Sequence, residues 1–228
     1  MPIELRLSSE FLGTAVLVMA VVGSGLMGEQ LSPDQGVVIL INQIATMLAL
    51  GVLVALLMPI SGAHINPAVT LAMAARRTIP LREAASYVVL QLLGGVLGTV
   101  LAHLMFGLPP LQVSDNVRIT PGSFLGEVIA TAGLLAVIVM ALAQQRAHLL
   151  ALLVPAWIGA AFFFTSSTSF ANPAVTVGRV LTDSFTGIDA ASAPWFILAQ
   201  LIGAALVVLI AGASSSMSHQ PTSEKEAA

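Results

Sequence analysis

Long apolar stretches alternate with short polar segments along most of this chain. Six of the stretches approach the length of about 20 mainly apolar residues that a membrane-spanning helix needs. They cover about 8–28, 36–58, 83–106, 123–143, 147–165 and 194–213. The polar, low-complexity segment 214–228 is expected to be a short disordered tail. The pattern predicts an all-α membrane protein.

Two polar interruptions fall where apolar membrane segments surround them, at 61–67 and 166–173. Each is followed by an apolar segment too short to span a membrane, 68–75 in the first case and up to about 181 in the second. Both segments are expected to be half-helices. Non-helical backbone at membrane depth is tolerated only where protein buries it or where it lines a water-filled cavity. Two such breaks therefore predict a shared cavity at mid-membrane.

Both interruptions end in the same string, Asn-Pro-Ala-Val-Thr, at 66–70 and at 172–176. Proline suits the first position of a helix, and asparagine is a good N-cap because its side-chain oxygen accepts a first-turn amide. The amide nitrogen of each asparagine then keeps its two donors for a pore. Half-helices entering from opposite faces would bring these donors and two positive helix ends together. Such a point favours an oxygen lone pair and repels cations.

The duplication extends beyond this string. A Glu-x-x-x-Thr pair and a Gln-Leu-x-Gly quartet recur in the same order: Glu10 and Thr14 with 91–94, then Glu127 and Thr131 with 200–203. We interpret 1–228 as a single membrane channel domain, with repeat one at about 8–106 and repeat two at about 123–213. Each repeat holds an odd number of spans, so the second is inverted relative to the first.

Composition excludes several classes of protein. The chain is 57% hydrophobic and 8% charged, which leaves too little polar surface for a soluble globule. A net charge of -3 gives no indication of nucleic-acid binding. With no cysteine and four scattered histidines, neither a metal site nor a catalytic cluster is expected. We expect a channel that needs no cofactor and catalyses no reaction.

The basic residues predict the orientation. Most fall at one side of the bundle: Arg6, Arg76, Arg77, Arg82, Arg146 and Lys225. Basic residues concentrate on the cytoplasmic side. We expect a multi-pass protein of the inner (plasma) membrane with both termini in the cytoplasm. The acidic residues around the first apolar stretch favour a retained helix over a cleaved signal peptide.

From Glu10 to about 213, the paired motifs and the matched glutamates and glutamines resemble the aquaporin, or major intrinsic protein, family, in particular its bacterial aquaglyceroporin-like members. The resemblance implies an aquaporin-like fold of six transmembrane helices and two re-entrant half-helices. It also implies one pore per subunit, a homotetramer in the lipid bilayer, and passive flux of small uncharged solutes.

Individual roles follow from this resemblance. Asn66 and Asn172, each followed by its motif partners Pro67 and Ala68 or Pro173 and Ala174, match the central asparagines that donate to the passing oxygen. Glu10 and Glu127 match buried glutamates that accept hydrogen bonds from the loops before the half-helices; a proton relay is the alternative. His64 is expected to stabilise its loop or to line the inner pore.

The chain departs from its family at the selectivity filter. Most members carry an arginine three positions after the second motif's asparagine, where this chain has Val175. The family's spacing puts the other filter positions at Thr46, Ala160 and Ser169, with Ala161 or Gly159 as alternatives in the fifth span. These small, uncharged residues predict a wide filter that passes water, glycerol, urea and metalloid hydroxides such as arsenous acid. A water-selective channel, an ion-coupled transporter with inverted repeats and a closed structural member remain alternatives.

Arg179 stands four residues after Val175, so both lie on one face of the second half-helix. Its charge could reach the outer mouth and compensate for the missing filter arginine. The alternative is a structural role, in which the side chain extends to the outer interface or pairs with Asp183.

Overall fold

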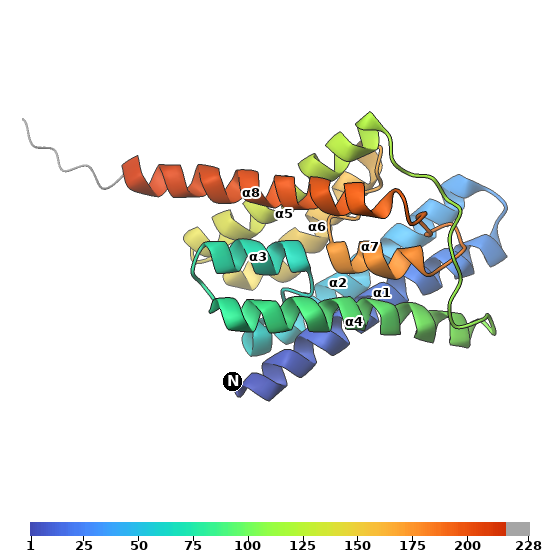
Figure 1. The fold of residues 1–228 in the computed structure, drawn as a ribbon, viewed down its shortest axis with the longest axis horizontal. Helices are drawn as coiled ribbons and strands as arrows, with labels where there is room; N and C mark the ends of the chain where they lie inside the picture. The colour runs from blue at the N-terminus through green and yellow to red at the C-terminus, as the bar shows by residue number, and fades with distance from the viewer. Residues whose placement is uncertain (218–228) are drawn as a thin grey trace, which may run out of the picture.

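The computed structural model describes residues 1–217, and every regular element in that range is helical (Figure 1). The elements are α1 (Ile3–Leu31), α2 (Gln35–Ser61), α3 (Pro67–Ala75), α4 (Leu81–Met105), α5 (Pro121–Ala143), the 3-10 turn η1 (Ala147–Leu149), α6 (Leu150–Phe164), α7 (Pro173–Val180) and α8 (Ala193–Met217). Six helical segments are long and apolar enough to cross a membrane, whereas α3 and α7 are short. The predicted architecture of six spans and two half-helices is confirmed.

The ends of the helices differ from the sequence-based boundaries. Helix α1 begins at Ile3, and α8 continues to Met217, so the first residues of the expected tail are helical. Serine is a moderate helix former and does not stop a helix that is already propagating. The rest of the tail, including Lys225, lies outside the described residues.

The same packing occurs in each half of the chain. Helix α1 packs against α2 and α4, and α5 packs against α6 and α8. A Cβ atom at Gly94 of α4 would overlap the carbonyl oxygen of Phe11, and one at Gly203 of α8 would lie 2.5 Å from the carbonyl oxygen of Val128. The glycine of each Gln-Leu-x-Gly quartet therefore allows two helix backbones to touch.

The two half-helices approach each other inside the bundle. The N-terminus and the end of α8 lie at the same end of the molecule, as an even number of spans requires (Figure 1). The segment 106–120 runs across the opposite end (Figure 1). It is held there by backbone hydrogen bonds from Gln112 to Leu181, from Ser114 to Val180 and from Asp189 to Asn116. This segment therefore covers the C-terminal end of α7.

Candidate functional site: the meeting point of the half-helices

Each half-helix starts at an asparagine that caps it. Asn66 and Asn172 have extended backbones, with φ of -159° and -156°, and a proline follows each at the first helical position. The Oδ1 atom of Asn66 accepts from the Ala68 amide at 2.9 Å, and that of Asn172 accepts from the Ala174 amide at 2.9 Å. Both motifs therefore have the helix-capping geometry that residue type alone indicates.

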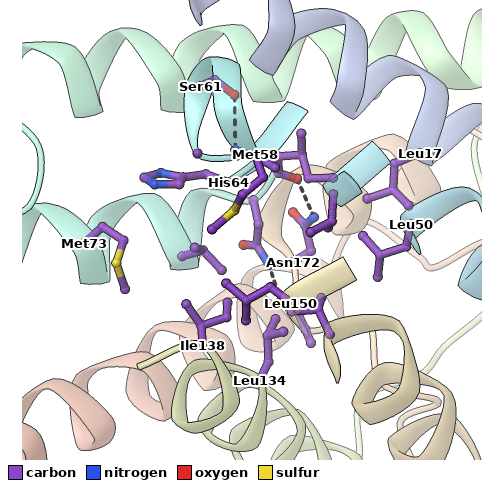
Figure 2. A pocket seen from close by; sticks show the side chains of 18 of the residues that line it. Leu17, Leu50, Met58, Ser61, His64, Met73, Leu134, Ile138, Leu150 and Asn172 are labelled. Atoms are coloured by element: carbon purple, nitrogen blue, oxygen red, sulfur yellow. Dashed lines mark hydrogen bonds between the residues drawn. The ribbon is translucent and has the colours of Figure 1, made fainter. Parts of the chain in front are cut away.

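The two caps are also joined to each other. Asn66 Nδ2 donates to the carbonyl of Ala171 at 2.7 Å, and Asn172 Nδ2 donates to the carbonyl of Ile65 at 2.9 Å (Figure 2). The sequence-based expectation left both amide hydrogens for the pore. The structure uses one of the two to join the half-helices and leaves the second. Two reciprocal hydrogen bonds thus join the N-terminal ends of the two half-helices.

Strained backbone leads into both half-helices. Ile65 and Ala171, directly before the asparagines, have φ of 39° and 47°, and Ala63 and Ser169, two residues earlier, have φ of 49° and 47°. Residues other than glycine rarely adopt this left-handed region, which costs about 1–3 kcal/mol for each. Four strained residues at matching offsets imply that the surrounding structure holds both loops in place.

Glu10 holds the first loop. Its carboxylate is fully buried and accepts from four donors: Ser61 Oγ at 2.6 Å, the His64 amide at 3.0 Å, the Ile65 amide at 2.6 Å and Gln91 Nε2 at 2.7 Å. Gln91 also donates to Thr70 Oγ1 at 2.9 Å. A helix α1 carboxylate thereby joins the end of α2, the strained loop, α3 and α4.

Glu127 makes the same arrangement in the second half. It is fully buried and accepts from the amides of Phe170 at 2.8 Å and Ala171 at 2.9 Å, and from Gln200 Nε2 at 2.6 Å. Gln200 in turn donates to Thr176 Oγ1 at 3.0 Å. Hydrogen bonds to a carboxylate are stronger than those between neutral groups, so the bonds to Glu127 offset the strain of the loop.

His64 lies beside the first loop and faces the cavity. Its Nδ1 atom is 3.1 Å from Thr70 Oγ1, and its ring meets the Tyr87 ring edge-on at a centroid separation of 5.5 Å. His64 therefore contacts the residues that follow its loop and also lies on the cavity wall, so the two roles expected for it do not exclude each other.

A cavity of about 430 Å³ passes the asparagines and extends from Arg6 near the N-terminus to Arg179 of α7. Figure 2 shows its inner part, where apolar side chains from several helices converge: Leu50, Met58, Met73, Leu134, Ile138 and Leu150. None of these residues stands out in the sequence. They carry no motif, and only the packing of α2, α3, α5 and α6 places them together.

Two of the four filter positions lie on the cavity wall and a third lies close to it. Val175 and Ser169 line the cavity, and Thr46 is one turn along α2 from the lining residue Leu50. Ser169 Oγ and Thr46 Oγ1 are buried and have no hydrogen-bond partner within the described residues. These two hydroxyls therefore have unused hydrogen-bonding capacity at or just behind the cavity wall.

The structure does not place Ala160 at the cavity. It is exposed, on the same side of α6 as the exposed Phe163 and Phe164, whereas the α6 residues that line the cavity are Leu150, Val154 and Ile158. A 3.6-residue period turns residue 160 away from that stripe; Ala161 lies on the same face as the stripe and is fully buried, but it is not among the residues that line the cavity. Gly159 instead faces Gln43 and Met47 of α2. The family's spacing was counted back from the second motif through a non-helical loop, and it therefore predicted a residue on the face of α6 that points away from the cavity.

Arg179 neither extends to the interface nor pairs with Asp183. It is 2% exposed and lines the cavity. Its Nε atom donates to the carbonyl of Thr186, and its guanidinium lies 3.4 Å from the centroid of the Phe170 ring. In residues 1–217 the only ion pair joins Arg6 to Glu83. The structural role expected for Arg179 at the surface is therefore wrong.

The chain is similar to known proteins over most of its length. Residues 4–170 match the family described as Major intrinsic protein. Aquaglyceroporin AqpS of Rhizobium meliloti (strain 1021) is 48% identical over 201 residues, which cover 87% of this chain and 85% of that protein. Aquaporin-5 of Rattus norvegicus is 37% identical over 131 residues, 54% of this chain and 47% of its own length.

Among solved structures, the aquaglyceroporin from Plasmodium falciparum superposes with a TM-score of 0.68 over 92% of this chain and 95% of that one. Its sequence identity is 22%, so this likeness concerns the fold alone. The family match covers most of the chain, and AqpS is similar over nearly its whole length. The chain belongs to the major intrinsic protein family.

Proposed function

We propose that this chain is a passive channel with a wide, uncharged filter that conducts water, glycerol and neutral metalloid hydroxides such as arsenous acid. The observation that carries the proposal is Val175, an apolar residue on the cavity wall one turn into α7 from Asn172. The similarity to an aquaglyceroporin over most of the chain supports water and glycerol as solutes.

The polar groups around the cavity suit a solute that carries several hydroxyls. A solute entering a narrow pore loses water and needs replacement hydrogen bonds. Asn66 and Asn172 on the cavity wall each keep a donor, and Ser169, also on that wall, has a hydroxyl without a protein partner among the described residues. Glycerol and arsenous acid have three hydroxyls and no charge. They can therefore exchange water for these groups without carrying a charge past two positive helix ends.

Further parts of the proposal rest on the family. Because it is a family of membrane channels, we infer that the chain catalyses no reaction. Both intramembrane carboxylates, Glu10 and Glu127, accept hydrogen bonds from the loops, which argues against their use as ion-coupling sites. We place the channel in the inner membrane as a homotetramer with cytoplasmic termini.

Flux through purified protein in liposomes tests the proposal. Light scattering would follow water, glycerol and urea, and arsenic analysis of filtered vesicles would follow arsenous acid. The wild type should carry all four above protein-free vesicles. The Val175→Arg variant should lower glycerol and arsenous acid flux by about tenfold, because a barrier higher by about 1.4 kcal/mol suffices for that factor. Water flux should persist.

The Val175→Leu variant is the matched control, since it adds volume without charge and should reduce the flux of large solutes less. Water flux without glycerol flux in the wild type would favour a water-selective channel. Absence of all flux from a folded oligomer would contradict the proposal.

A further inference from the structure

A buried cation occupies the cavity wall one turn beyond Val175. Arg179 and Val175 lie four residues apart on α7 and both line the cavity, so the Cα atom of Arg179 lies about 6 Å farther along the helix from Asn172 than that of Val175 does. At 2% exposure the guanidinium is shielded from bulk water. A charge in such a place acts over a longer range than one at the surface.

The contacts of Arg179 hold the guanidinium without neutralising it. Among the side chains that the structure describes, the only hydrogen bond of the guanidinium is from Nε to the carbonyl of Thr186, and the group lies over the Phe170 ring. No carboxylate pairs with it in residues 1–217. Guanidinium has five N–H donors, so the terminal nitrogens still have donors for a molecule in the cavity.

Arg118, from the segment that covers the C-terminal end of α7, supports this arrangement. Its Nε atom donates to the carbonyl of Gly187 and one terminal nitrogen donates to the carbonyl of Phe185, on either side of Thr186. Its guanidinium also lies 5.6 Å from the Phe170 ring centroid. Burial lowers the pKa of Arg118, but arginine starts high enough to stay charged at neutral pH. Arg118 thus fixes the backbone that holds Arg179.

We propose that Arg179 is the filter cation of this channel, relocated one helical turn outward, and that Arg118 is the residue that positions it. Its free donors bind the oxygens of passing neutral solutes, and its charge repels cations and protons. Selection by size at Val175, Thr46 and Ser169 is thereby separated from selection by charge at Arg179. The inference rests on the proposed function, because it assigns the charge filter of the same neutral-solute channel.

Replacing the charge while keeping the packing tests Arg179. The Arg179→Met variant keeps an extended side chain against Phe170 and loses the cation. In proteoliposomes, an entrapped pH dye would report proton leak and labelled methylammonium would report cation entry. Both rates should rise by about tenfold or more, because repulsion between nearby buried charges exceeds the energy of that factor. The matched control is Arg82→Met, which changes an exposed arginine at the cytoplasmic end and should leave both rates unchanged.

Two further variants separate charge from structure. Arg118→Gln should raise the leak in the same direction but less, because Arg179 remains. The double variant Val175→Arg with Arg179→Met returns a charge one turn inward and should restore cation exclusion. If Arg179→Met caused the leak only by damaging the structure, the added arginine would not restore it. Unchanged proton and methylammonium rates in a folded Arg179→Met channel would overturn the inference, as would a leak that Val175→Arg does not reverse. Failure of the proposed function would appear differently, as no glycerol flux in the wild type.

Discussion

Individual side chains hold a strained structure at the centre of this membrane protein. Glu10 and Glu127 are buried, and each accepts hydrogen bonds from two successive backbone amides of a loop in left-handed conformation. A carboxylate has two oxygens and about four acceptor sites, whereas the glutamine side chain of the same size has one acceptor oxygen and a donor NH2 group. These hydrogen bonds offset the cost of burying a charge. They also order the loop that presents the carbonyl of Ile65 or Ala171 to the opposite asparagine.

At this scale, the Glu127→Gln variant should lower the free energy of unfolding by about 3 kcal/mol or more, because buried hydrogen bonds to charged groups are worth about 1.5–3 kcal/mol each. The new NH2 group would face backbone N–H donors. Thermal unfolding in detergent, followed by tryptophan fluorescence, measures the change. Glu4→Gln, at an exposed site, is the control and should have no effect. A normal unfolding temperature combined with altered proton flux would instead support the proton-relay interpretation.

The elements of the bundle are placed by close backbone contacts. Half-helix α7 lies against α4, where Thr99 Oγ1 donates to the carbonyl of Gly178 at 2.9 Å. A Cβ atom at Gly95 of α4 would lie 2.6 Å from the carbonyl oxygen of Ala174, inside the second motif. The position of the pore-lining face of α7 therefore depends on the absence of a side chain on α4.

The Gly95→Ala variant should displace α7 and lower the free energy of unfolding by about 1–3 kcal/mol, the usual cost of overpacking. Glycerol flux should fall with it. Gly212→Ala on α8 is the matched control: no atom lies within 4 Å of the added Cβ, so the change should be neutral or stabilise the helix by up to about 1 kcal/mol. Equal unfolding temperatures and fluxes for the two variants would show that the α4–α7 contact does not position the half-helix.

For the molecule as a whole, the apolar outer surface and the even number of spans determine how it lies in a membrane. Helix α2 presents an exposed apolar stripe at Ile44, Leu48, Val52 and Leu56, which lipid or a neighbouring subunit would cover. We expect native mass spectrometry in detergent to give four times the subunit mass. A monomer that retains flux would contradict the tetramer proposal.

The orientation can be tested cleanly because the chain contains no cysteine. Single cysteines at Arg82 and Asp115, both exposed, mark opposite ends of the bundle. In intact cells a membrane-impermeant maleimide should label Asp115→Cys directly and Arg82→Cys only after permeabilisation, since basic residues favour the cytoplasmic side. The reverse labelling pattern would invert the proposed topology.

The sequence by itself determined the spans, the two half-helices and their asparagine caps, because apolar length and helix capping depend on neighbours a few residues away. The matched glutamates could also be recognised, since their pattern occurs twice. Only the tertiary structure decided which atoms meet across the bundle. It joined Asn66 to Ala171, turned Ala160 away from the cavity, brought unmarked apolar residues such as Ile138 onto its wall, and placed Arg179 between Phe170 and Thr186. The physical reason is that these contacts join segments far apart in the chain, and strained loops break the helical periodicity from which side-chain directions are counted.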